Sequence, residues 1–520
     1  MKKFLISDLA KIIKASLDAR CSMLDTRRRR KSSIENRESS IKQFFTGVSI
    51  DSRTAAAGDC FFAITGENFD GHDYVSDAFS KGAVCAVVSK KSIIKKQTGK
   101  TILEVDDTIK ALCDFARDYR RRCGFKVVAI TGSAGKTTVR QIVYHVLSQK
   151  YNVFQAPKNF NNNIGLPLTL LGADPEHQIV IAELGTSHPG EIAYLTRIAQ
   201  PNIAVVTNVY PAHLEGFGNL QAIVKEKLSI AEGLSSDGIL IINADLAGCL
   251  SNYQLPVTNN KVLTFGKSDG SDYQARDLTR ASSPCCHGQD GRGTFGFGSS
   301  FSIDDTEIYL PLAGPGNIEN ALAAWAVCSR LGITIEDFAR RLKTLLPVPM
   351  RAEALKFGTL TVINDCYNAN PASMRNALNI LTTVKNSKFP ASGRGRRLVF
   401  ICGEMAELGN QSEQLHAELG SDIAGAKVQL LIAVGKSAKI AAVAAKETAG
   451  YNLKVEYFND TISACNNLQK FIKDNDIILV KGSRTAKLEM AVEKLKELPI
   501  CARRFPSGDA NRKTKVENRK

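Results

Sequence analysis

The sequence predicts an α/β protein of three domains. Its 520 residues suffice for about three domains of ordinary size, which excludes a single small binding module. From residue 124 onward, continuous apolar runs alternate with turn residues and segments of helical period, the pattern of buried parallel strands in βαβ units. The same alternation resumes after Pro311, so a second doubly wound domain is expected there.

The N-terminal region, residues 1–123, predicts a small α/β domain, because short apolar runs such as 60–64 and 83–88 are separated by Gly, Asp and Asn turns. Its first residues imitate a signal peptide. Charged residues interrupt the apolar stretch, however, so the start of a strand or helix is expected instead. Residues 21–46, rich in Arg and Ser, predict an inserted, solvated loop; a binding patch is the alternative.

The central region, residues 124–313, predicts a parallel sheet with strands at 127–130, 179–182, 203–206 and 239–242. Within it, the Ser/Gly/Cys-rich stretch 281–300 lacks periodicity and predicts a loop or weak hairpin. The C-terminal region, residues 314–500, predicts a Rossmann-like domain with strands near 360–364, 398–402, 429–434 and 476–480. Residues 501–520 form a charged, basic tail.

The formal net charge of +16 first suggests a nucleic-acid or membrane-surface protein. Three segments, 21–42, 391–397 and 501–520, supply +12 of this charge, so the rest of the chain has the balance of an ordinary enzyme. No run of about 18 apolar residues is present, so no membrane span is predicted. The thirteen cysteines are scattered, with no C-x-x-C pair, which argues against a disulfide framework or structural zinc. We therefore expect a cytoplasmic protein.

The strongest motif is KVVAITGSAGKTTVRQIVYHVL at 126–147, where an apolar strand, a glycine-rich turn and a helix follow one another. Backbone N–H groups of such a turn cradle phosphates, Lys136 can reach the β- and γ-phosphates, and the Thr137 hydroxyl can ligate Mg²⁺. The alternative is an ordinary glycine turn with a chance GKT. Ile130 stands where the common Walker spacing has its first glycine, so this is the shorter TGxxGKTT form. The motif predicts a site for a nucleoside triphosphate.

Three further residues become candidates for the same site once the glycine-rich loop is recognised. Glu183 follows an apolar strand, and because the carboxyl ends of parallel strands line the ligand crevice, it is placed to be a second Mg²⁺ ligand. His213 lies in the loop after the next strand, beside Glu215, and Lys227 lies on an amphipathic helix. Each alone is more often a cap or a solvated surface residue. In combination they indicate a catalytic site.

These motifs, in this order, resemble the Mur ligases, ATP-dependent enzymes that add amino acids to the cell-wall precursor. The resemblance rests on TGSAGKTT, the Glu of AELG, the His of PAHLEGFG and the KEK helix, and it extends from about residue 47 to about residue 495. Four other segments resemble the family's UDP-sugar segment, Asn loop, adenine-binding stretch and ribose loop: 49–74, 158–171, 310–324 and 363–374. The implied domains are a UDP-sugar-binding domain (1–123), an ATP-binding domain (124–313) and a Rossmann-like ligase domain (314–500).

The resemblance implies how the reaction proceeds. The terminal carboxylate of UDP-N-acetylmuramoyl-tripeptide would attack the γ-phosphate of ATP, giving an acyl phosphate and ADP, and an amine would then attack the acyl carbon. The motifs NVYPAHLEGFG, NDCYNANPASM, GEMAELG and LVKGSRTAKLE resemble those of the members that add D-alanyl-D-alanine. The D-N-P-R signature of the diamino-acid-adding members is absent from the sequence. Whether the tripeptide ends in lysine or meso-diaminopimelate stays open.

The motif and the resemblance together assign the site residues. The expected nucleotide-binding residues are Thr131, Gly132, Ser133, Ala134, Gly135, Lys136, Thr137, Thr138, Asn317, Asn320, Arg351 and Asp365. The expected catalytic residues are Lys136, Glu183, His213 and Lys227, and the expected ligands of two Mg²⁺ ions are Thr137, Glu183, His213 and Lys227. The expected substrate contacts are Ser52, Arg53, Asp70, His72, Asn161, Asn162, Asn368 and Arg484.

Two details of this assignment come from the resemblance alone. Lys227 is expected to be carbamylated, which would turn a metal-repelling ammonium into an anionic oxygen ligand suited to Mg²⁺. Gly316 stands where relatives usually have His before the first Asn of the adenine stretch, so no ring contact from that position is expected.

Two kinds of alternative remain. One is another ligase of the superfamily, such as the diamino-acid-adding enzyme or folylpolyglutamate synthetase. The other is a P-loop NTPase that binds nucleic acid through its basic arms. The favoured interpretation predicts ATP, UDP-N-acetylmuramoyl-tripeptide and D-alanyl-D-alanine as ligands of a monomer, without nucleic acid or membrane insertion.

Overall fold

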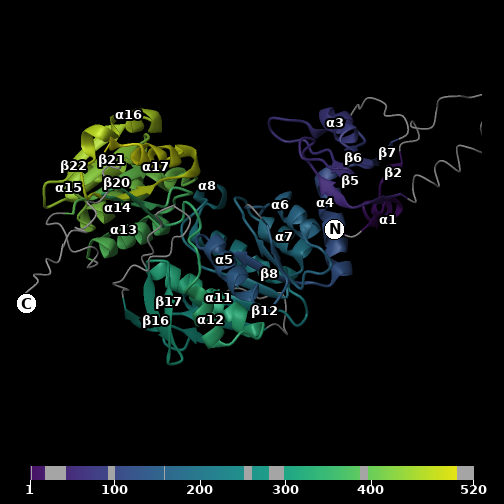
Figure 1. The fold of residues 1–520 in the computed structure, drawn as a ribbon, viewed down its shortest axis with the longest axis horizontal. Helices are drawn as coiled ribbons and strands as arrows, with labels where there is room; N and C mark the ends of the chain where they lie inside the picture. The colour runs from purple at the N-terminus through teal and green to yellow at the C-terminus, as the bar shows by residue number, and fades with distance from the viewer. Residues whose placement is uncertain are drawn as a thin grey trace, which may run out of the picture. The chain divides into compact units, whose positions relative to one another are not determined.

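The computed structural model describes residues 1, 3–17, 43–91, 100–156, 159–250, 261–279, 298–386 and 396–499. The chain divides into two compact units. The first comprises Met1–Val209, Gly216–Arg276 and Glu319–Leu342; the second comprises Tyr210–Glu215, Asp277–Ile318 and Lys343–Lys520. Parallel sheets flanked by helices confirm the α/β class (Figure 1), whereas the three domain boundaries stay predictions. No helix in the described ranges is long and apolar enough to cross a bilayer.

The N-terminal part of the first unit is a five-stranded sheet. Its order is β2 (Ser16–Leu17), β7 (Thr101–Val105), β6 (Cys85–Ser89), β5 (Asp59–Phe62) and β4 (Gly47–Ser49). All neighbours pair in parallel except β2 and β7. The associated helices are α1 (Ile6–Ile12), α3 (Val75–Ser80) and α4 (Thr108–Cys123). The apolar runs predicted near 60–64 and 83–88 are therefore buried strands β5 and β6.

The predicted loop at 21–46 is wrong at its C-terminal end. Phe44 and Phe45 form strand β3, which pairs antiparallel with β1 (Phe4–Leu5). The Phe45 ring is fully buried and lies 5.7 Å from the rings of Phe4 and Phe115. Burial of these aromatic rings against α4 outweighs the polar composition of the preceding segment. The remainder of the predicted insertion, 21–42, lies outside the described residues.

The central sheet of the first unit has seven parallel strands. Their order is β14 (Tyr273–Gln274), β13 (Lys261–Gly266), β12 (Ile239–Asn243), β11 (Ile203–Val206), β8 (Lys126–Thr131), β10 (Ile179–Glu183) and β9 (Val153–Gln155). The four strands predicted from apolar runs are β8, β10, β11 and β12. Because β8 lies between β10 and β11, the strand order reverses there, and ligands of such sheets bind at the carboxyl ends of the strands at this point.

Helices connect and flank these strands. They are α5 (Lys136–Leu147), α6 (Gly165–Gly172), α7 (Glu191–Ala199), α8 (Leu214–Phe217), α9 (Leu220–Leu228), α10 (Ala247–Leu250), α11 (Pro315–Arg330) and α12 (Ile335–Leu342). Helix α5 follows the central strand β8 directly (Figure 1). This order places the first residues of α5 at the carboxyl edge of the sheet.

The second unit contains two sheets. The smaller comprises β15 (Arg276–Thr279), β16 (Ser299–Ile303) and β17 (Thr306–Leu310), with β16 and β17 antiparallel. The stretch 281–300 is predicted as a loop or weak hairpin, and its described end agrees with the hairpin: Ser299 and Ser300 pair with Leu310 and Tyr309. Alternating burial along β16 stabilises these residues in the sheet. Residues 281–297 lie outside the described residues, as does the tail 501–520.

The larger sheet has the order β18 (Glu353–Phe357), β19 (Leu360–Asn364), β23 (Ile477–Lys481), β20 (Leu398–Gly403), β21 (Leu430–Val434) and β22 (Lys454–Phe458). Only β18 runs antiparallel to its neighbour. All four predicted strands are confirmed as β19, β20, β21 and β23. The helices are α13 (Pro371–Asn386), α14 (Ser412–Gly425), α15 (Ala438–Thr448), α16 (Thr461–Phe471) and α17 (Glu489–Lys496).

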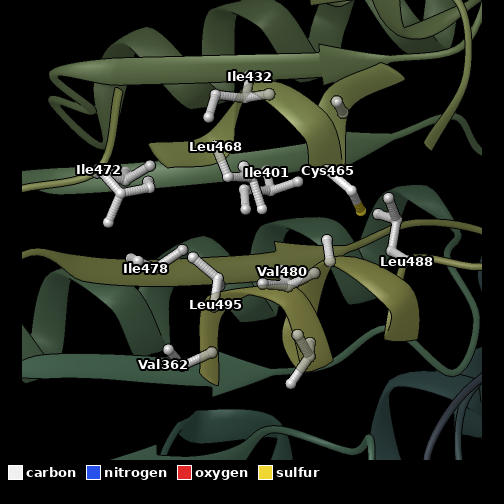
Figure 2. Close-up of a cluster of buried hydrophobic side chains, with 14 of the residues drawn as sticks. Val362, Ile401, Ile432, Cys465, Leu468, Ile472, Ile478, Val480, Leu488 and Leu495 are labelled. Atoms are coloured by element: carbon white, nitrogen blue, oxygen red, sulfur yellow. The ribbon is translucent and has the colours of Figure 1, made fainter. Parts of the chain in front are cut away.

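One face of this sheet packs against α16 and α17. Figure 2 shows Val362, Ile401, Ile432 and Val480 of the strands directed toward Leu468 and Leu495 of these helices. These side chains are fully buried, and burying apolar surface of this kind is the main favourable contribution to folding. The core fixes the strands, and with them the loops at their carboxyl ends.

Candidate active site

The phosphate loop follows β8 and depends on two glycines with positive φ. Gly132 has φ of +144° and Gly135 has φ of +84°. A Cβ atom at Gly132 would lie 1.9 Å from Thr207 Oγ1, and one at Gly135 would lie 2.1 Å from Asn320 Oδ1. Any other residue would therefore be both strained and too large at these two positions.

The segment after β11 holds the loop in shape. Asn208 accepts hydrogen bonds from Ser133 N through its carbonyl oxygen (3.0 Å) and from Ala134 N through Oδ1 (2.9 Å). Thr207 Oγ1 donates to the carbonyl oxygen of Ala134 at 2.6 Å. Sequence reasoning missed Thr207 and Asn208. The rule that led to Glu183, polar residues directly after a buried parallel strand, would have found them.

Helix α5 starts at Lys136, so its N-terminal N–H groups and positive helix end lie at the loop. Lys136 Nζ donates to the carbonyl oxygen of Gly132 at 2.6 Å, and this contact folds the ammonium group back over the loop. Thr131 is buried and its hydroxyl donates to the carbonyl oxygen of Leu184. Thr138 occupies the first turn of α5 and is half-buried. The loop thus presents backbone donors and one cation to an anion.

Glu183, the last residue of β10, lies beside this helix start. Thr137 Oγ1 donates to Glu183 Oε2 at 3.3 Å, and both side chains are buried. The other carboxylate oxygen, Oε1, lies 3.2 Å from Nε of Arg140, one helical turn further along α5. The predicted pair of oxygen donors is therefore formed. The guanidinium group of Arg140 accompanies it, and no sequence motif had indicated this residue.

Lys227 lies on α9, and its side chain is 2% exposed. Burial, and then the positive charge of Lys136, lower the pKa of Lys227 well below its ordinary value. The preceding Glu226 accepts hydrogen bonds from the backbone N–H groups of Gly190 (2.7 Å) and Ile192 (2.8 Å) at the start of α7. These bonds fix the rotation of α9 and so direct Lys227 into the interior.

The two asparagines of the adenine stretch both lie on α11 and are buried. Asn320 lies directly against Gly135 of the phosphate loop. Asn317 Nδ2 donates to the carbonyl oxygen of Ala313 at 2.8 Å, which closes the start of the helix. In place of a side chain at Gly316, Asn376 Oδ1 accepts a hydrogen bond from Gly316 N at 3.3 Å.

The asparagine loop contributes one residue to the strand end and one to a helix. Asn161 lies against Gly185, two residues after Glu183, and its carbonyl oxygen accepts from Gly185 N at 2.8 Å. Asn162 Oδ1 instead accepts from Gly165 N at 2.8 Å, at the start of α6. Asn162 therefore caps a helix within the protein.

Two of the predicted N-terminal substrate residues, Asp70 and His72, bond to each other. Asp70 Oδ1 accepts from His72 N at 3.0 Å and lies 2.6 Å from His72 Nδ1, while His72 Nε2 accepts from Ser89 N. Both ring nitrogens of the buried His72 are thus used inside the domain. Their contact with a substrate stays a prediction.

Arg53 differs in being exposed. Its guanidinium group binds both carboxylate oxygens of Asp51 and lowers the pKa of that carboxyl group to about 2. Ser52, between them in the chain, is buried. Asp51 already neutralises Arg53. An anionic ligand would therefore have to displace Asp51 from the guanidinium group or bind Arg53 together with it.

In the second unit, Asp365 and Asn368 belong to the loop that follows β19. Lys481, the last residue of β23, donates to Asp365 Oδ2 at 2.7 Å and to the carbonyl oxygen of Asn368 at 2.9 Å. Asp365 Oδ1 accepts from Ala352 N at 3.0 Å. Sequence reasoning missed Lys481, although it lies in the same KGSR motif, three positions before the predicted Arg484.

Arg351 and Arg484 approach one aromatic ring of the same loop. The guanidinium carbon of Arg351 lies 4.2 Å from the centroid of the Tyr367 ring, and that of Arg484 lies 6.0 Å from it. Arg484 also forms an ion pair with Glu489 at 3.1 Å. Both distances are within the range at which a cation is attracted to the face of an aromatic ring. The structure thus brings Arg351, Asp365, Asn368 and Arg484 together around segment 365–368.

His213 lies in the second unit, in the short segment Tyr210–Glu215. Its φ is +54°, and its Nδ1 atom contacts a carboxylate oxygen of Glu407, itself at φ of +61°. Glu215 N donates to the carbonyl oxygen of Glu407 at 3.2 Å. His213 is thus held by a carboxylate, the usual partner of a metal-binding histidine.

Loops at the carboxyl ends of parallel strands, with a phosphate loop among them, define a nucleotide-dependent enzyme. Residues 44–120, 130–328 and 350–484 match, respectively, the models described as Mur ligase family, catalytic domain; Mur ligase middle domain; and Mur ligase, glutamate ligase domain. The chain belongs to the Mur ligase family.

Curated relatives agree in name. The UDP-N-acetylmuramoyl-tripeptide--D-alanyl-D-alanine ligase of Bacillus subtilis (strain 168) is 33% identical over 457 residues, which are 87% of this chain and 94% of that protein. The protein of the same name from Escherichia coli (strain K12) is 34% identical over 458 residues, again 87% and 94% of the two chains.

Solved structures agree in fold. A crystal structure of MurF from Acinetobacter baumannii is similar with a TM-score of 0.78 at 27% identity, covering 96% of this chain and 99% of that one. MurF ligase from Thermotoga maritima in complex with ADP has a TM-score of 0.71 at 26% identity, covering 86% and 96%.

Proposed function

We propose that the protein is an ATP-dependent ligase that joins D-alanyl-D-alanine to UDP-N-acetylmuramoyl-tripeptide. The observation that carries this function is a formed phosphate loop, with Thr137 and Glu183 in contact, in a chain one-third identical to enzymes of that name over nearly its whole length. We place the reaction in the cytoplasm, where ATP and nucleotide-linked precursors are available.

The chemistry requires activation of a carboxylate, which is a poor electrophile at neutral pH. An oxygen of the tripeptide carboxylate attacks the γ-phosphorus of ATP, the bond to the bridging oxygen breaks, and ADP leaves. The amine of D-alanyl-D-alanine then attacks the acyl carbon, and phosphate leaves as the amide forms and the amine loses a proton. Both steps depend on positioning and on charge neutralisation.

The first unit supplies the phosphate-binding groups in this proposal. The backbone donors of residues 131–138 bind phosphate oxygens, and Lys136 leaves the carbonyl oxygen of Gly132 to neutralise the transferred phosphoryl group. Asn320, which already lies against Gly135, contacts the adenine base. Asn317, at the start of α11, contacts the same base.

Mg²⁺ fits the residues at Glu183. Glu183 Oε1 is buried and, apart from its ion pair with Arg140, receives no hydrogen bond from the described residues. The Thr137 hydroxyl is a second hard oxygen donor next to this carboxylate. Among the residues described, no three His, Cys, Asp or Glu side chains cluster as a complete metal cage. This suits an ion that takes its other ligands from phosphates and water. The ion would supply positive charge to the phosphates.

Lys227 and His213 are the proposed ligands of a second ion. Burial and the charge of Lys136 lower the pKa of Lys227, which favours the neutral, nucleophilic amine relative to an exposed lysine. It would add to CO₂ with loss of one proton, giving an anionic carbamate. His213 would offer Nε2, since its Nδ1 is engaged by Glu407.

In the second unit, Arg351 and Asp365 are the proposed contacts to phosphate and ribose, and Asn368 and Arg484 are those to the incoming dipeptide. In the N-terminal sheet, Ser52, Arg53 and the loop held by Asp70 and His72 are the proposed contacts to the UDP-sugar. Asn161 and Asn162 are proposed to meet the same substrate from the central sheet.

An ADP-release assay tests the function. With UDP-N-acetylmuramoyl-tripeptide and ATP, we expect ADP to form when D-alanyl-D-alanine is added, but not with a free diamino acid or glutamate. ADP formation with either of the latter alone would assign the chain to another ligase of the superfamily. Assaying the lysine- and the diaminopimelate-containing tripeptides separately identifies the natural substrate.

A truncated chain tests the nucleic-acid alternative. It should lack residues 21–42 and 503–520, ending the first deletion before the β3 strand. A ligase keeps its specific activity after this change. A protein that binds nucleic acid through its basic arms would instead lose that affinity and its salt dependence.

The carbamate has a separate test. Lys227→Ala should lower kcat by about 100-fold or more, whereas Lys225→Ala, at an exposed position of the same helix, should not. Stripping CO₂ from the wild type should lower activity, and bicarbonate should restore it. ¹³C-labelled bicarbonate should give a carbamate signal in the wild type that Lys227→Ala lacks; a missing signal together with full activity would refute the carbamate.

A further inference from the structure

Strand β23 carries a buried ion pair at each end. At its amino end, Asp476 precedes the strand and binds Arg397 through both carboxylate oxygens, at 3.0 Å and 2.7 Å. At its carboxyl end, Lys481 binds Asp365 at 2.7 Å. The Asp476 and Lys481 side chains are each 2% exposed. Only the second pair lies at the edge where a parallel sheet binds its ligands.

Lys481 uses all its donors on one short segment. An ammonium group has three N–H donors, and Lys481 Nζ contacts Asp365 Oδ2 (2.7 Å), the carbonyl oxygen of Asn368 (2.9 Å) and that of Asp365 (3.4 Å). The lysine thus spans segment 365–368 from its first to its last residue. No ligand is required for this arrangement, because every contact is within the fold.

The segment held by Lys481 joins two sets of proposed contacts. Asp365 is a proposed contact to the nucleotide (the nucleotide side), and Asn368 is a proposed contact to the incoming dipeptide (the acceptor side). Between them in the chain, Tyr367 has the guanidinium groups of Arg351 and Arg484 near its ring, one proposed for each side. A shift of the segment would therefore move four contact residues together.

We propose that Lys481 is a positioning residue that fixes the nucleotide-side and acceptor-side contacts of segment 365–368 in one arrangement. This inference rests on the proposed function for the identity of the acceptor. A compact ammonium with three divergent donors suits the three oxygens that surround it, whereas the planar fork of arginine does not. Lysine at this place therefore has a geometric reason beyond its charge.

The test compares Lys481→Met and Lys481→Arg with a matched control, Arg397→Met, at the other end of the same strand. Three quantities are measured for each protein: the thermal unfolding midpoint, the dissociation constant of ADP by calorimetry, and KM for ATP and for D-alanyl-D-alanine with kcat. All measurements use the full-length chain.

Lys481→Met should weaken ADP binding and raise KM for both ATP and the acceptor, each by about 10-fold or more, since small misplacements of contact groups have large kinetic effects. Lys481→Arg keeps the positive charge, so its unfolding midpoint should stay close to that of the wild type. Its dissociation constant for ADP and its KM values for ATP and the acceptor should nevertheless rise. Arg397→Met should lower the midpoint and leave the dissociation constant and both KM values within about twofold of the wild type.

The proposal is overturned if Lys481→Arg binds ADP and uses both substrates like the wild type, even when Lys481→Met fails to fold. It is equally overturned if Arg397→Met raises the same constants to the same extent. ADP binding does not depend on the acceptor, so this measurement still tests Lys481 if the wild type proves inactive with D-alanyl-D-alanine. That inactivity would refute the proposed function separately.

Discussion

Arg140 Nε lies 3.2 Å from Glu183 Oε1, and both side chains are buried at the junction of β10 and α5. The guanidinium compensates a carboxylate that would otherwise be a bare charge inside the protein. The same carboxylate is the proposed Mg²⁺ ligand. Arg140 and the proposed metal ion would therefore act on the same carboxylate, and Glu183 already has a cationic partner in the absence of nucleotide.

Replacing this arginine should destabilise the metal-free protein. Arg140→Met removes one partner of a buried ion pair and leaves the other, a change that costs about 3–5 kcal/mol. Part of this loss should be recovered when Mg²⁺ and ADP are added, because the ion can replace the guanidinium charge. Urea unfolding with and without Mg²⁺ and ADP measures both effects.

The control for this change is Arg197→Met, which breaks the exposed pair of Arg197 with Glu232. Such pairs contribute at most about 1 kcal/mol, so little destabilisation is expected. If Arg140→Met lost no more than this control, Glu183 would have another source of compensation.

Gly135→Ala should abolish nucleotide binding. The new Cβ would lie 2.1 Å from Asn320 Oδ1, so the phosphate loop or the start of α11 has to move. Calorimetry with ADP measures the loss, which we expect to exceed about 100-fold because the loop is the main phosphate contact.

Gly124→Ala separates this clash from backbone strain. Gly124 also has a positive φ, +70°, but a Cβ there meets no atom within 4 Å. It ends α4 and should cost about 1 kcal/mol of stability through strain alone, with unchanged ADP affinity. Equal effects of the two substitutions on ADP binding would show that the clash is unimportant.

Phe45→Ala and Phe44→Ala should differ sharply, although the residues are adjacent. Phe45 is fully buried among Phe4 and Phe115, and its loss should cost about 3–5 kcal/mol. Phe44 is 51% exposed, and its loss should cost less than about 0.5 kcal/mol. Similar unfolding midpoints for the two variants would contradict the β1–β3 pairing.

Lys356 gives a pH-dependent prediction. Burial, followed by repulsion from Arg396, lowers the pKa of Lys356 to about 8. Between pH 8 and the ordinary lysine pKa of 10.5, the unfolded chain holds a proton that the folded chain has lost. The wild type should therefore gain stability relative to Lys356→Met as the pH rises through this window. Urea unfolding of both proteins at pH 7 and pH 10 measures the change; a constant difference would contradict it.

Several elements could be read from the sequence because local patterns decide them. Every strand predicted from an apolar run in the two larger sheets is present, and TGSAGKTT forms the expected loop between β8 and α5. Continuous apolar runs can be buried on both faces only in the interior of a parallel sheet. Because β8 and β10 are parallel neighbours, the polar residues at their carboxyl ends lie close together, and Glu183 lies beside Thr137.

Other features could not be read because their partners are distant in the chain. Phe44–Phe45 looked like part of a polar loop, since its partner strand lies 40 residues earlier. Arg397 counted toward a surplus of basic charge, yet it neutralises Asp476, 79 residues away. Asp70 and His72 matched a substrate motif, but they bond to each other and to Ser89. A sequence motif can identify a residue, but it does not show which polar atoms of that residue are hydrogen-bonded within the protein.

The sequence by itself determined the fold class, the phosphate loop and the family, because these depend on apolar periodicity and on residues adjacent in the chain. Only the tertiary structure decided which charged groups act on one another: Arg140 compensates Glu183 and Lys481 compensates Asp365, whereas Lys136 repels Lys227. Those pairs link separate strands and helices. Their energies depend on burial and on distances of a few ångströms, which packing of the whole chain sets.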